Sequence, residues 1–462
     1  MPSSPRRRDA ELQTIPAYFH PLDAVGEWNR VYGSAGFLQY QFVVPHGAEP
    51  TLRAIVERCF TRVAVFRQRM QQRGMVPADV RSLDDVAQLP FMRKTDLRDH
   101  YPYGLFAVPM KEVVRLHASS GTTGKPIVVG YTRYDIDLWS SLMLRCFVAT
   151  GIQTGDVLQN AFGYGLFTGG LGAHYGAERL GATVIPISGG NTRRQIMVMK
   201  DFGVTAICCT PSYFVHLIEQ VHENGLRFAE LGLKIGIFGA EPWTEGMRTH
   251  IQRESGIRAY DIYGLSEILG PGVAVECSQQ AGLHMFEDQF LMEIVDPQTD
   301  QVLPDGQVGE LVITTLTKQA FPMIRYRTHD LTAVIPERCA CGRTLRRIRR
   351  IQSRSDDMLI IRGVNVFPSQ IEAALLSVMT SSPHYQIVLS RQGGLDQISV
   401  ELEVTEGMFG DRISQLEVLQ TRLAHAIEQT IGLRVPVRLV EPHTIARSEG
   451  KAVRVIDQRD KK

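Results

Sequence analysis

A short loop near position 120 carries the residues best suited to chemistry. Residues 119–126 read Ser-Ser-Gly-Thr-Thr-Gly-Lys-Pro. Glycines let backbone N–H groups approach a ligand closely, hydroxyls donate to phosphate oxygens, and a lysine supplies a mobile positive charge. The loop therefore favours the binding of a polyphosphate, and the alternative is an ordinary solvated turn. The candidate phosphate ligands are Ser119, Ser120, Gly121, Thr122, Thr123, Gly124 and Lys125.

This loop is not the P-loop of the Walker nucleotide-binding proteins. That pattern needs a glycine five residues before the second glycine of the loop, and a Ser or Thr after its lysine. The chain has Ser119 and Pro126 at these places. Strand-like residues flank the loop at Glu112–Leu116 and Ile127–Val129, so we expect it to link two strands and not to open a helix.

Composition excludes several classes of protein. The chain has 462 residues, 44% of them hydrophobic and 21% charged, which is typical of a globular protein with more than one domain. Its net charge of +1 gives no reason to expect nucleic acid or an acidic membrane as a partner. The sequence has no apolar run of the ~20 residues that a membrane span needs, and its first residues lack the apolar region of a secretory signal. Seven cysteines, an odd number, fit a reducing cytoplasm, where we expect the protein to be located.

The middle of the chain has the pattern of an α/β protein. Between about Val113 and Val334, short apolar runs alternate with helical stretches, which predicts a largely parallel sheet. The expected strands are 182–187, 205–209, 234–238 and 258–263, with helices at 194–202 and 213–224. Gly309–Thr315 and Leu331–Ile335 are expected as added antiparallel strands.

The pattern changes near the polar stretch Arg350–Asp357. Beyond it, residues 386–390 and 398–404 alternate apolar and polar side chains, as half-buried strands do. One apolar helix face follows and ends at Gly432; it consists of Leu416, Leu419, Leu423 and Ile427. We therefore expect an atypical N-terminal segment (1–50), a large domain (51–353) and a small α+β domain (354–462).

Four further motifs follow the loop in a fixed order. Asp261–Glu267 follows a predicted strand and combines an aromatic ring, a glycine turn and two carboxylates. Arg325–Asp330 ends on an acidic residue suited to accept two ribose hydroxyls. Arg354–Asp357 marks the domain boundary, and Ser448–Lys451 places a lysine in a glycine-containing loop. Each motif alone could be surface decoration, but all four in this order argue against chance.

Together these motifs resemble the acyl-adenylate-forming superfamily of acyl-CoA synthetases, adenylation domains and luciferases. Within it, the sequence is most similar to the phenylacetate–CoA ligases, from about Arg62 to Asp457. The most specific stretches are Tyr164–Glu178, Phe238–Glu245, Asp261–Gly272 and Ser355–Ile371. The resemblance implies an α/β fold in which a large adenylate-forming domain with mixed or parallel sheets precedes a small C-terminal α+β domain.

The resemblance also implies two half-reactions. A carboxylate first attacks the α-phosphate of ATP, giving an acyl-adenylate and pyrophosphate, and a thiol, normally that of coenzyme A, then displaces AMP. The loop with Lys125 would hold the β- and γ-phosphates, Glu267 would carry Mg²⁺, and Lys451 would reach the substrate carboxylate and α-phosphate in the first half-reaction. Lys125, Glu267 and Lys451 are thus the expected catalytic residues.

Further roles are implied for the nucleotide site. Tyr263 would stack on adenine, Asp330 would accept the ribose hydroxyls, and Arg354 would assist it. Asp356 would be the hinge about which the small domain turns between the two half-reactions. The remaining residues expected at the nucleotide are Ala240, Glu241 and Pro242, which form the far wall of the adenine slot, and Asp261 and Gly264.

The expected acid-binding segment is Tyr164–Gly172. It has no acidic side chain to pair with the ammonium group of an amino acid, and it offers Tyr164, Phe167 and glycines. Such a pocket suits an aryl or arylacetic acid, and plain core aromatics are the alternative. The acceptor thiol stays open between coenzyme A and the pantetheine of a carrier protein, because both have the same reactive arm. A catalytically degenerate relative is a further alternative, and a homodimer is expected from the family.

Four metal-ligand side chains form two close pairs in the sequence. Cys277 and His284 are seven residues apart, and Cys339 and Cys341 flank one alanine. Three thiolates and one imidazole would form a closed tetrahedral zinc site. Four unligated residues are the alternative.

The N-terminal segment departs from the rest. His20–Arg30 and Gly36–Pro45 resemble a fragment, at residues 9–45, of the decaprenylphosphoryl-ribose oxidase flavoproteins. The flavin-binding remainder of those proteins has no counterpart in this sequence, so we infer no redox activity.

Overall fold

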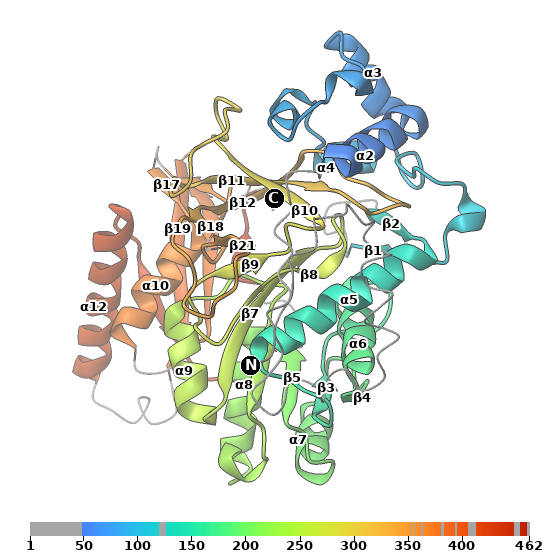
Figure 1. Ribbon diagram of the computed structural model, residues 1–462. Helices are drawn as coiled ribbons and strands as arrows, with labels where there is room; N and C mark the ends of the chain where they lie inside the picture. The colour runs from blue at the N-terminus through green and yellow to red at the C-terminus, as the bar shows by residue number, and fades with distance from the viewer. Residues whose placement is uncertain are drawn as a thin grey trace, which may run out of the picture. The chain divides into compact units, whose positions relative to one another are not determined.

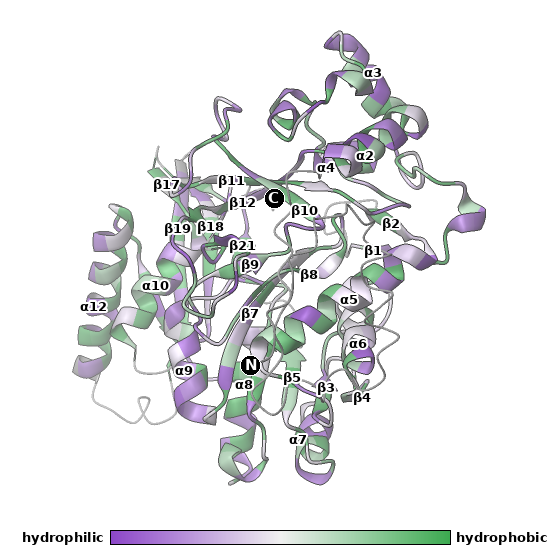
Figure 2. Ribbon diagram, viewed as in Figure 1, coloured by the Kyte–Doolittle hydropathy of each residue, from purple (hydrophilic) through white to green (hydrophobic). Residues whose placement is uncertain are grey.

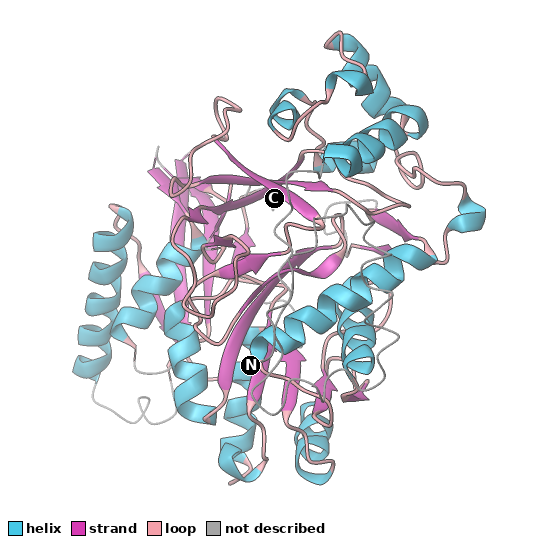
Figure 3. Cartoon of the chain, viewed as in Figure 1, coloured by secondary structure: helices cyan, strands magenta, loops and turns pink. Residues whose placement is uncertain are grey.

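The computed structural model of the chain combines helices with several strand layers (Figure 3). It describes residues 49–119, 126–351, 353–355, 357–361, 364–379, 383–392, 395–404, 413–447 and 453–459. All of these belong to one compact unit, Phe42–Lys462. Three predicted functional residues, Lys125, Asp356 and Lys451, lie outside the described residues, as does the rest of the segment Ser120–Gly124.

Three helices begin the described chain: α2 (Glu49–Arg62), α3 (Ala64–Gln72) and α4 (Lys94–Asp99). In α2 the buried side chains are Leu52, Ile55, Val56 and Cys59. Their spacing of three and four residues puts them on one helix face, which packs into the core.

The predicted phosphate loop links two strands, as the sequence indicated. β1 (Arg115–Ala118) pairs with β2 (Val128–Tyr131) in antiparallel register. The expected first strand, Glu112–Leu116, was placed three residues too early. The reason is that residues 110–112 form a 3-10 turn, whereas the polar His117 is buried and belongs to the strand. After β2, helix α5 (Arg133–Thr150) begins at the cap Thr132, whose hydroxyl oxygen accepts the N–H of Asp135.

The largest sheet has nine strands in the order β13-β14-β9-β8-β7-β6-β5-β3-β4. Five neighbouring strands, from β7 to β4, are parallel, and the other four are antiparallel to their neighbours. The strands are β3 (Val157–Asn160), β4 (Thr183–Ile185), β5 (Ala206–Cys209), β6 (Ile235–Phe238), β7 (Arg258–Leu265), β8 (Gly270–Glu276), β9 (Leu283–Met285), β13 (Val334–Ile335) and β14 (Arg347–Ile348). The four strands expected between 182 and 263 are confirmed as β4, β5, β6 and β7, with ends that shift by at most two residues.

Helices connect the parallel strands, as right-handed crossovers require. They are α6 (Thr168–Leu180), α7 (Thr192–Asp201), α8 (Pro211–Glu223) and α9 (Glu245–Ser255). α7 and α8 confirm the two predicted helices. Figure 1 shows α5 and α6 side by side, and the two helices are in extensive contact. β5 is buried along its whole length and apolar throughout, which is typical of a parallel strand covered on both faces.

A second sheet has four antiparallel strands in the order β10-β11-β12-β15. They are β10 (Phe290–Val295), β11 (Gly309–Thr315), β12 (Tyr326–Thr332) and β15 (Ser353–Arg354). The predicted strand Gly309–Thr315 is confirmed. The predicted strand Leu331–Ile335 was wrong as a single element, because the chain changes sheets within it: β12 ends at Thr332 and the next two strand residues join the nine-stranded sheet as β13.

The C-terminal part is a small α+β arrangement with its own apolar core. A hairpin of β16 (Leu359–Ile361) and β17 (Val364–Val366) precedes a four-stranded sheet in the order β20-β19-β18-β21. The sheet strands are β18 (Tyr385–Gln392), β19 (Leu395–Glu403), β20 (Val437–Val440) and β21 (Val455–Asp457). Helices α10 (Pro368–Val378) and α12 (Ile413–Ile431) lie side by side (Figure 1). The predicted strands and helix of this part are confirmed.

The hydropathy of α12 follows its packing. Hydrophobic and hydrophilic residues alternate around it in Figure 2, and its buried side chains include Leu423 and Ile427, which the sequence predicted. The helix ends before Gly432, whose positive φ of 69° suits a residue without a Cβ. Among the described residues, no helix has the length and apolar character needed to cross a bilayer.

Candidate functional site

Several of the predicted site residues lie at or just beyond the carboxyl ends of the parallel strands. β3 leads into the loop with Tyr164, β6 into Ala240–Pro242, and β7 into the turn with Glu267. In sheets of this kind, ligands bind beyond the carboxyl ends of the strands. The fold therefore brings segments far apart in the sequence to one edge.

Three predicted nucleotide residues meet around one carboxylate. The hydroxyl of Tyr263 donates to Asp330 Oδ2 at 2.6 Å, and Arg354 NH1 donates to Asp330 Oδ1 at 3.2 Å. Strand pairing sets this arrangement, because Asp330 on β12 lies directly opposite Arg354 on β15. The Asp330 carboxylate is buried. The Tyr263 side chain is buried too, and its own burial raises its pKa well above the ordinary value. The cluster combines an aromatic ring, an acceptor carboxylate and a cation, as a bound nucleoside requires.

Asp261 lies in a separate buried ion-pair network. Its carboxylate is 3.2 Å from the guanidinium of Arg350, and its backbone N–H donates to Glu276 at 2.8 Å. Arg248 donates to both oxygens of Glu276, at 2.7 and 2.9 Å. Burial and the neighbouring Glu276 raise the pKa of Asp261. The Asp261 side chain thus has partners of its own within this network, and a direct role of Asp261 at the nucleotide stays a prediction.

The segment Ala240–Pro242 forms a sharp loop after β6. Ala240 has a positive φ of 69°, and Glu241 Oε1 accepts the backbone N–H of Ser212 at 2.8 Å, at the start of α8. Glu241 and Pro242 line a cavity of about 380 Å³ together with Arg354. The predicted adenine wall and the predicted ribose arginine therefore border the same space.

The predicted acid-binding loop is anchored by polar contacts. Asn160, the last residue of β3, donates to the hydroxyl of Tyr164 and to the carbonyl of Gly170, both at 2.7 Å. The Tyr164 hydroxyl also lies 3.1 Å from His174 Nδ1. Burial raises the pKa of Tyr164 to about 12, so the phenol stays neutral. Phe167, by contrast, is 40% exposed and free to form part of a pocket wall.

Backbone contacts tie this loop to the strand that precedes the phosphate loop. The carbonyl of Leu166 accepts the N–H of Ala118 at 2.8 Å and lies 3.1 Å from His117 Nδ1. The next residue, Ser119, has a hydroxyl that accepts the N–H of Ile127 at 3.2 Å. Ser119 is the one member of the predicted phosphate loop within the described residues. The acid loop and the base of the phosphate loop are thus direct neighbours.

Glu267 lies in the turn between β7 and β8. Its side chain is mostly buried, with the residue 8% exposed. The hydroxyl of the preceding Ser266 is 3.0 Å from that of Thr168 at the start of α6, which links the turn to the acid loop. Gly264 permits the close approach of β7 and β8, because a Cβ there would lie 1.9 Å from the carbonyl oxygen of Gly270. The turn therefore has a fixed course.

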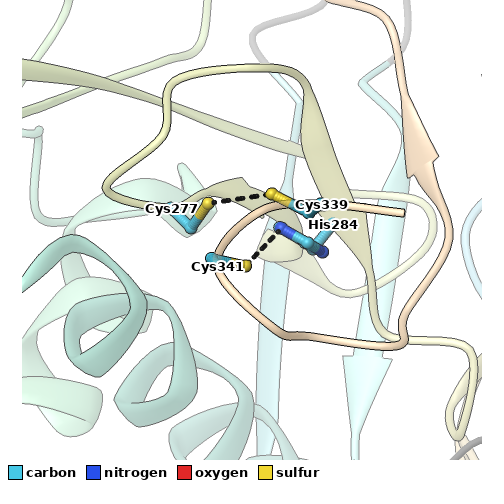
Figure 4. Close-up of side chains that lie close together, drawn as sticks. All are labelled: Cys277, His284, Cys339 and Cys341. Carbon is cyan, nitrogen blue, oxygen red and sulfur yellow. Dashed lines mark hydrogen bonds between the residues drawn. The ribbon is translucent and has the colours of Figure 1, made fainter. Parts of the chain in front are cut away.

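The four predicted zinc ligands converge (Figure 4). Their ligand atoms all lie within 4.8 Å of one another, with Cys277 Sγ 3.7 Å from Cys339 Sγ and Cys341 Sγ 3.5 Å from His284 Nε2. Pairing of β14 with β9 brings the two halves together. His284 Nδ1 lies 3.3 Å from the carbonyl of Leu345, which leaves Nε2 facing the thiols. Burial lowers the pKa of His284 to about 4, so the imidazole is neutral at neutral pH.

Some side chains that hold the site residues in place were not predicted from the sequence. Asn160 and His174 hold Tyr164, and Arg350 pairs with Asp261. One signal was available for Asn160, a polar residue at the end of an apolar strand-like run. For His174 and Arg350 the local sequence has no such signal, because their partners are distant elements.

Two models of known protein families match two separate parts of the chain. The AMP-binding enzyme family model matches residues 45–317, and the model of the AMP-binding enzyme C-terminal domain matches residues 363–459. A crystal structure of 2-hydroxyisobutyryl-CoA ligase in the postadenylation state with 2-HIB-AMP superposes with a TM-score of 0.84, at 31% identity over 89% of each chain. The same enzyme with CoA in the thioesterification state gives 0.65 at 32% identity.

Curated relatives match almost the full chain. The phenylacetate–coenzyme A ligase of Thermus thermophilus is 48% identical over 89% of this chain and 96% of its own length. That of Pseudomonas putida is 51% identical over 88% of this chain and 92% of its own. A decaprenylphosphoryl-β-D-ribose oxidase of Mycolicibacterium smegmatis is 56% identical over 46 residues, 10% of each chain, which confirms the predicted fragment. The chain therefore belongs to the AMP-binding enzymes and, within them, to the phenylacetate–coenzyme A ligase family.

Proposed function

We propose that the protein activates an aryl or arylacetic acid with ATP, through an acyl-adenylate, and transfers the acyl group to coenzyme A. The proposal rests mainly on one observation: Tyr263 and Arg354 both donate hydrogen bonds to the carboxylate of Asp330. These residues come from three separate segments, and each matches a motif of adenylate-forming enzymes. The relatives named phenylacetate–coenzyme A ligase favour phenylacetate as the acid.

The nucleotide lies across this cluster. Tyr263 stacks on adenine against the loop Ala240–Pro242, with Gly264 and Asp261 at the same strand end. The Asp330 carboxylate accepts the ribose hydroxyls, and Arg354, which already donates to that carboxylate, keeps it oriented. A buried acceptor of fixed direction costs little reorganisation when the nucleotide binds.

Phosphoryl chemistry depends on positioning and charge neutralisation. The loop Ser119–Lys125 holds the β- and γ-phosphates, and its Ser119 end is fixed by the β1–β2 hairpin. Glu267 would be the carboxylate ligand that holds Mg²⁺, which when bound would neutralise phosphate charge. Lys451 holds the substrate carboxylate against the α-phosphate. Lys125 and Lys451, which lie outside the described residues, have these roles by sequence resemblance alone.

The acid binds in the loop between β3 and α6. Tyr164 has a neutral phenol whose hydroxyl is held by Asn160, so its ring has a fixed direction. Phe167 provides a second, partly exposed ring. Packing of an aryl acid against these rings would contribute about 0.5–1.5 kcal/mol per ring pair beyond area burial.

We further propose domains at 1–50, 51–353 and 354–462, with Asp356 as the hinge. The C-terminal residues form a hydrophobic cluster of their own, from Ile361 to Val437. The unequal TM-scores against two states of one relative, 0.84 and 0.65, support a rearrangement between the half-reactions. A turn of the C-terminal domain about Asp356 would then prepare the same site first for adenylation and next for thioester formation.

Zinc binding is a separate proposal, for the cluster of Cys277, His284, Cys339 and Cys341. In a tetrahedral site with zinc bond lengths of ~2.3 Å to sulfur and ~2.0 Å to nitrogen, ligand atoms are separated by ~3.8 Å (S–S) and ~3.5 Å (S–N). Two of the separations between ligand atoms, 3.7 Å for Cys277 Sγ–Cys339 Sγ and 3.5 Å for Cys341 Sγ–His284 Nε2, are close to these values, and all of them are within 4.8 Å. The carbonyl of Leu345 fixes the histidine in the orientation that a metal ligand requires. The site is structural, because all four positions are protein ligands.

The thioester step gives the direct test of the acceptor. Purified protein is incubated with ATP, Mg²⁺ and phenylacetate, and with either free coenzyme A or a pantetheine-bearing carrier protein, and acyl thioesters are quantified by mass spectrometry. We expect phenylacetyl–coenzyme A at a rate at least about tenfold above carrier loading, which corresponds to about 1.4 kcal/mol. Preferential carrier loading would favour a stand-alone adenylating enzyme. A homodimer and a cytoplasmic location remain predictions.

A further inference from the structure

A buried lysine lies directly behind the turn that carries Glu267. Lys318 follows β11 and is 1% exposed. Its ammonium donates to the carbonyl of Ile268 at 2.7 Å and to that of Glu267 at 3.3 Å. Burial lowers the pKa of Lys318 to about 7, while Asp135 and Glu267 act in the opposite direction. An ammonium in such a place is costly, so the contacts that it makes need an explanation.

Both hydrogen bonds of Lys318 go to carbonyl groups of one short turn, residues 266–269. Residues 266–269 form a single helical turn in which the N–H groups of Ile268 and Leu269 bond back to Leu265. Such a turn leaves its last carbonyls without partners in the helix. Lys318 satisfies the first two of these, and the hydroxyl of Tyr131 donates to the third, that of Leu269, at 2.7 Å.

The lysine is itself held in a rigid frame. The backbone N–H groups of Gln319 and Ala320 donate to the two oxygens of Asp135, at 2.6 and 2.9 Å. Asp135 is fully buried in the first turn of α5. The ammonium lies 5.0 Å from the centre of the Tyr131 ring, within cation–π distance. Lys318 therefore connects the first turn of α5, through the backbone that Asp135 holds, to the turn with Glu267.

We propose that Lys318 is a positioning residue for the first half-reaction: by holding the main chain at Glu267 and Ile268, it aims the Glu267 carboxylate at Mg²⁺–ATP. This inference rests on the proposed function, in which Glu267 is the Mg²⁺ ligand. Residues that orient a metal ligand typically contribute 10–100-fold to metal affinity or activity. The effect should therefore appear in the Mg²⁺ dependence and not in acid or thiol binding.

The test uses Lys318→Met, which keeps chain length and apolar packing but removes the donor. Wild type and variant are compared in acid-dependent pyrophosphate release over a range of Mg²⁺, and in thioester formation from preformed acyl-adenylate, which needs no ATP. We expect the half-saturating Mg²⁺ concentration to rise about tenfold or more in the variant. The KM for the acid and the rate of the thioester step should each change less than about twofold.

Phe66→Leu is the matched control, because it destabilises the distant α3 core without touching the turn. It should leave the Mg²⁺ dependence unchanged even where its melting temperature falls as far as that of the lysine variant. If Lys318→Met does not fold, Lys318→Gln, which retains one donor, should show an intermediate rise of about threefold. An unchanged Mg²⁺ dependence, or equal loss in both half-reactions, would overturn the inference. Failure of the proposed function is distinct, because wild type itself would then release no acid-dependent pyrophosphate.

Discussion

Asp330 is the residue on which the nucleotide site depends most. Its two oxygens already accept from Tyr263 and Arg354, which are 67 and 24 residues away in the sequence. The carboxylate is buried, and the guanidinium of Arg354 lies 3.2 Å from it, which offsets part of the cost of burying a charge. The ribose hydroxyls of a bound nucleotide would use the remaining lone pairs of the same oxygens.

Lys451 is predicted to act in adenylation and not in thioester formation. The variant Lys451→Ala should lower acid-dependent pyrophosphate release by ~10²–10³-fold, because one electrostatic contact to the developing charge is lost. Rapid-quench assays of both half-reactions measure this. Transfer from a preformed acyl-adenylate to coenzyme A should be largely spared, and an equal loss in the two steps would contradict the assignment.

Glu372 should make the stability of the protein depend on pH. This carboxyl lines the cavity beside Glu241, and burial raises its pKa to about 7. The native state therefore keeps a proton that the unfolded chain loses near its ordinary pKa of about 4.5. The contribution of Glu372 to stability is present at low pH and is lost as pH rises through 7, at about 1.4 kcal/mol per pH unit.

The variant Glu372→Gln should remove this dependence. Relative to wild type, its free energy of unfolding should be about equal near pH 4.5 and higher by about 3 kcal/mol above pH 7. Urea unfolding across this pH range measures the difference. Glu417→Gln, at an exposed position of α12, is the control and should show a flat difference. A flat difference for Glu372→Gln as well would contradict the prediction.

At the scale of elements, a strand was predicted correctly where the local sequence pattern determines its bounds. It was predicted wrongly where packing against distant elements determines them. β5 was predicted closely because it is a continuous apolar run, and β11 because its centre, Leu311–Ile313, is apolar and β-branched threonines follow it. The run Leu331–Ile335 looked like one strand, but it is shared between two sheets, and no periodicity marks that change. β1 was misplaced because His117 is polar in sequence yet buried against Tyr131 and Trp139.

The residues of the site also fall into two groups, those that the sequence motifs predicted and those that they did not. Motifs identified Tyr263, Asp330 and Arg354 because adenylate chemistry needs those residue types, and the structure brings them together. Lys318 and Arg350 were missed because each acts through a partner on another element. A lone lysine or arginine in a sequence is most often a solvated surface residue.

The β13–β14 hairpin provides the element-scale prediction. Its loop contributes Cys339 and Cys341, so zinc should fasten the hairpin to β9. Protein expressed with ample zinc should contain about one equivalent, and Cys341→Ser should lose it and melt at a lower temperature. Plasma emission spectrometry and thermal unfolding measure these outcomes.

The control for the hairpin is Cys59→Ser, a buried cysteine in α2 outside the cluster. This variant is destabilised by a core polar group but should retain its zinc. Wild-type protein with less than about 0.2 equivalents of zinc would end the proposal.

At the scale of the whole molecule, the catalytic unit should not need the N-terminal segment. The family model begins at residue 45, and the compact unit begins at Phe42. Deletion of residues 2–41 should change the rate of thioester formation and the melting temperature little, with rates within about twofold. A loss of more than about tenfold would show that the segment contributes to folding or to the site.

We propose that separate parts of the chain converge on one nucleotide, where a carboxylic acid forms a mixed anhydride with AMP. The most direct measurement is exchange of labelled pyrophosphate into ATP, across phenylacetate, benzoate and hydroxybenzoates, with a no-acid control. We expect exchange that requires Mg²⁺ and an aryl acid, is strongest with phenylacetate, and is lost in Lys451→Ala. Folded protein that gives no exchange with any acid would contradict it.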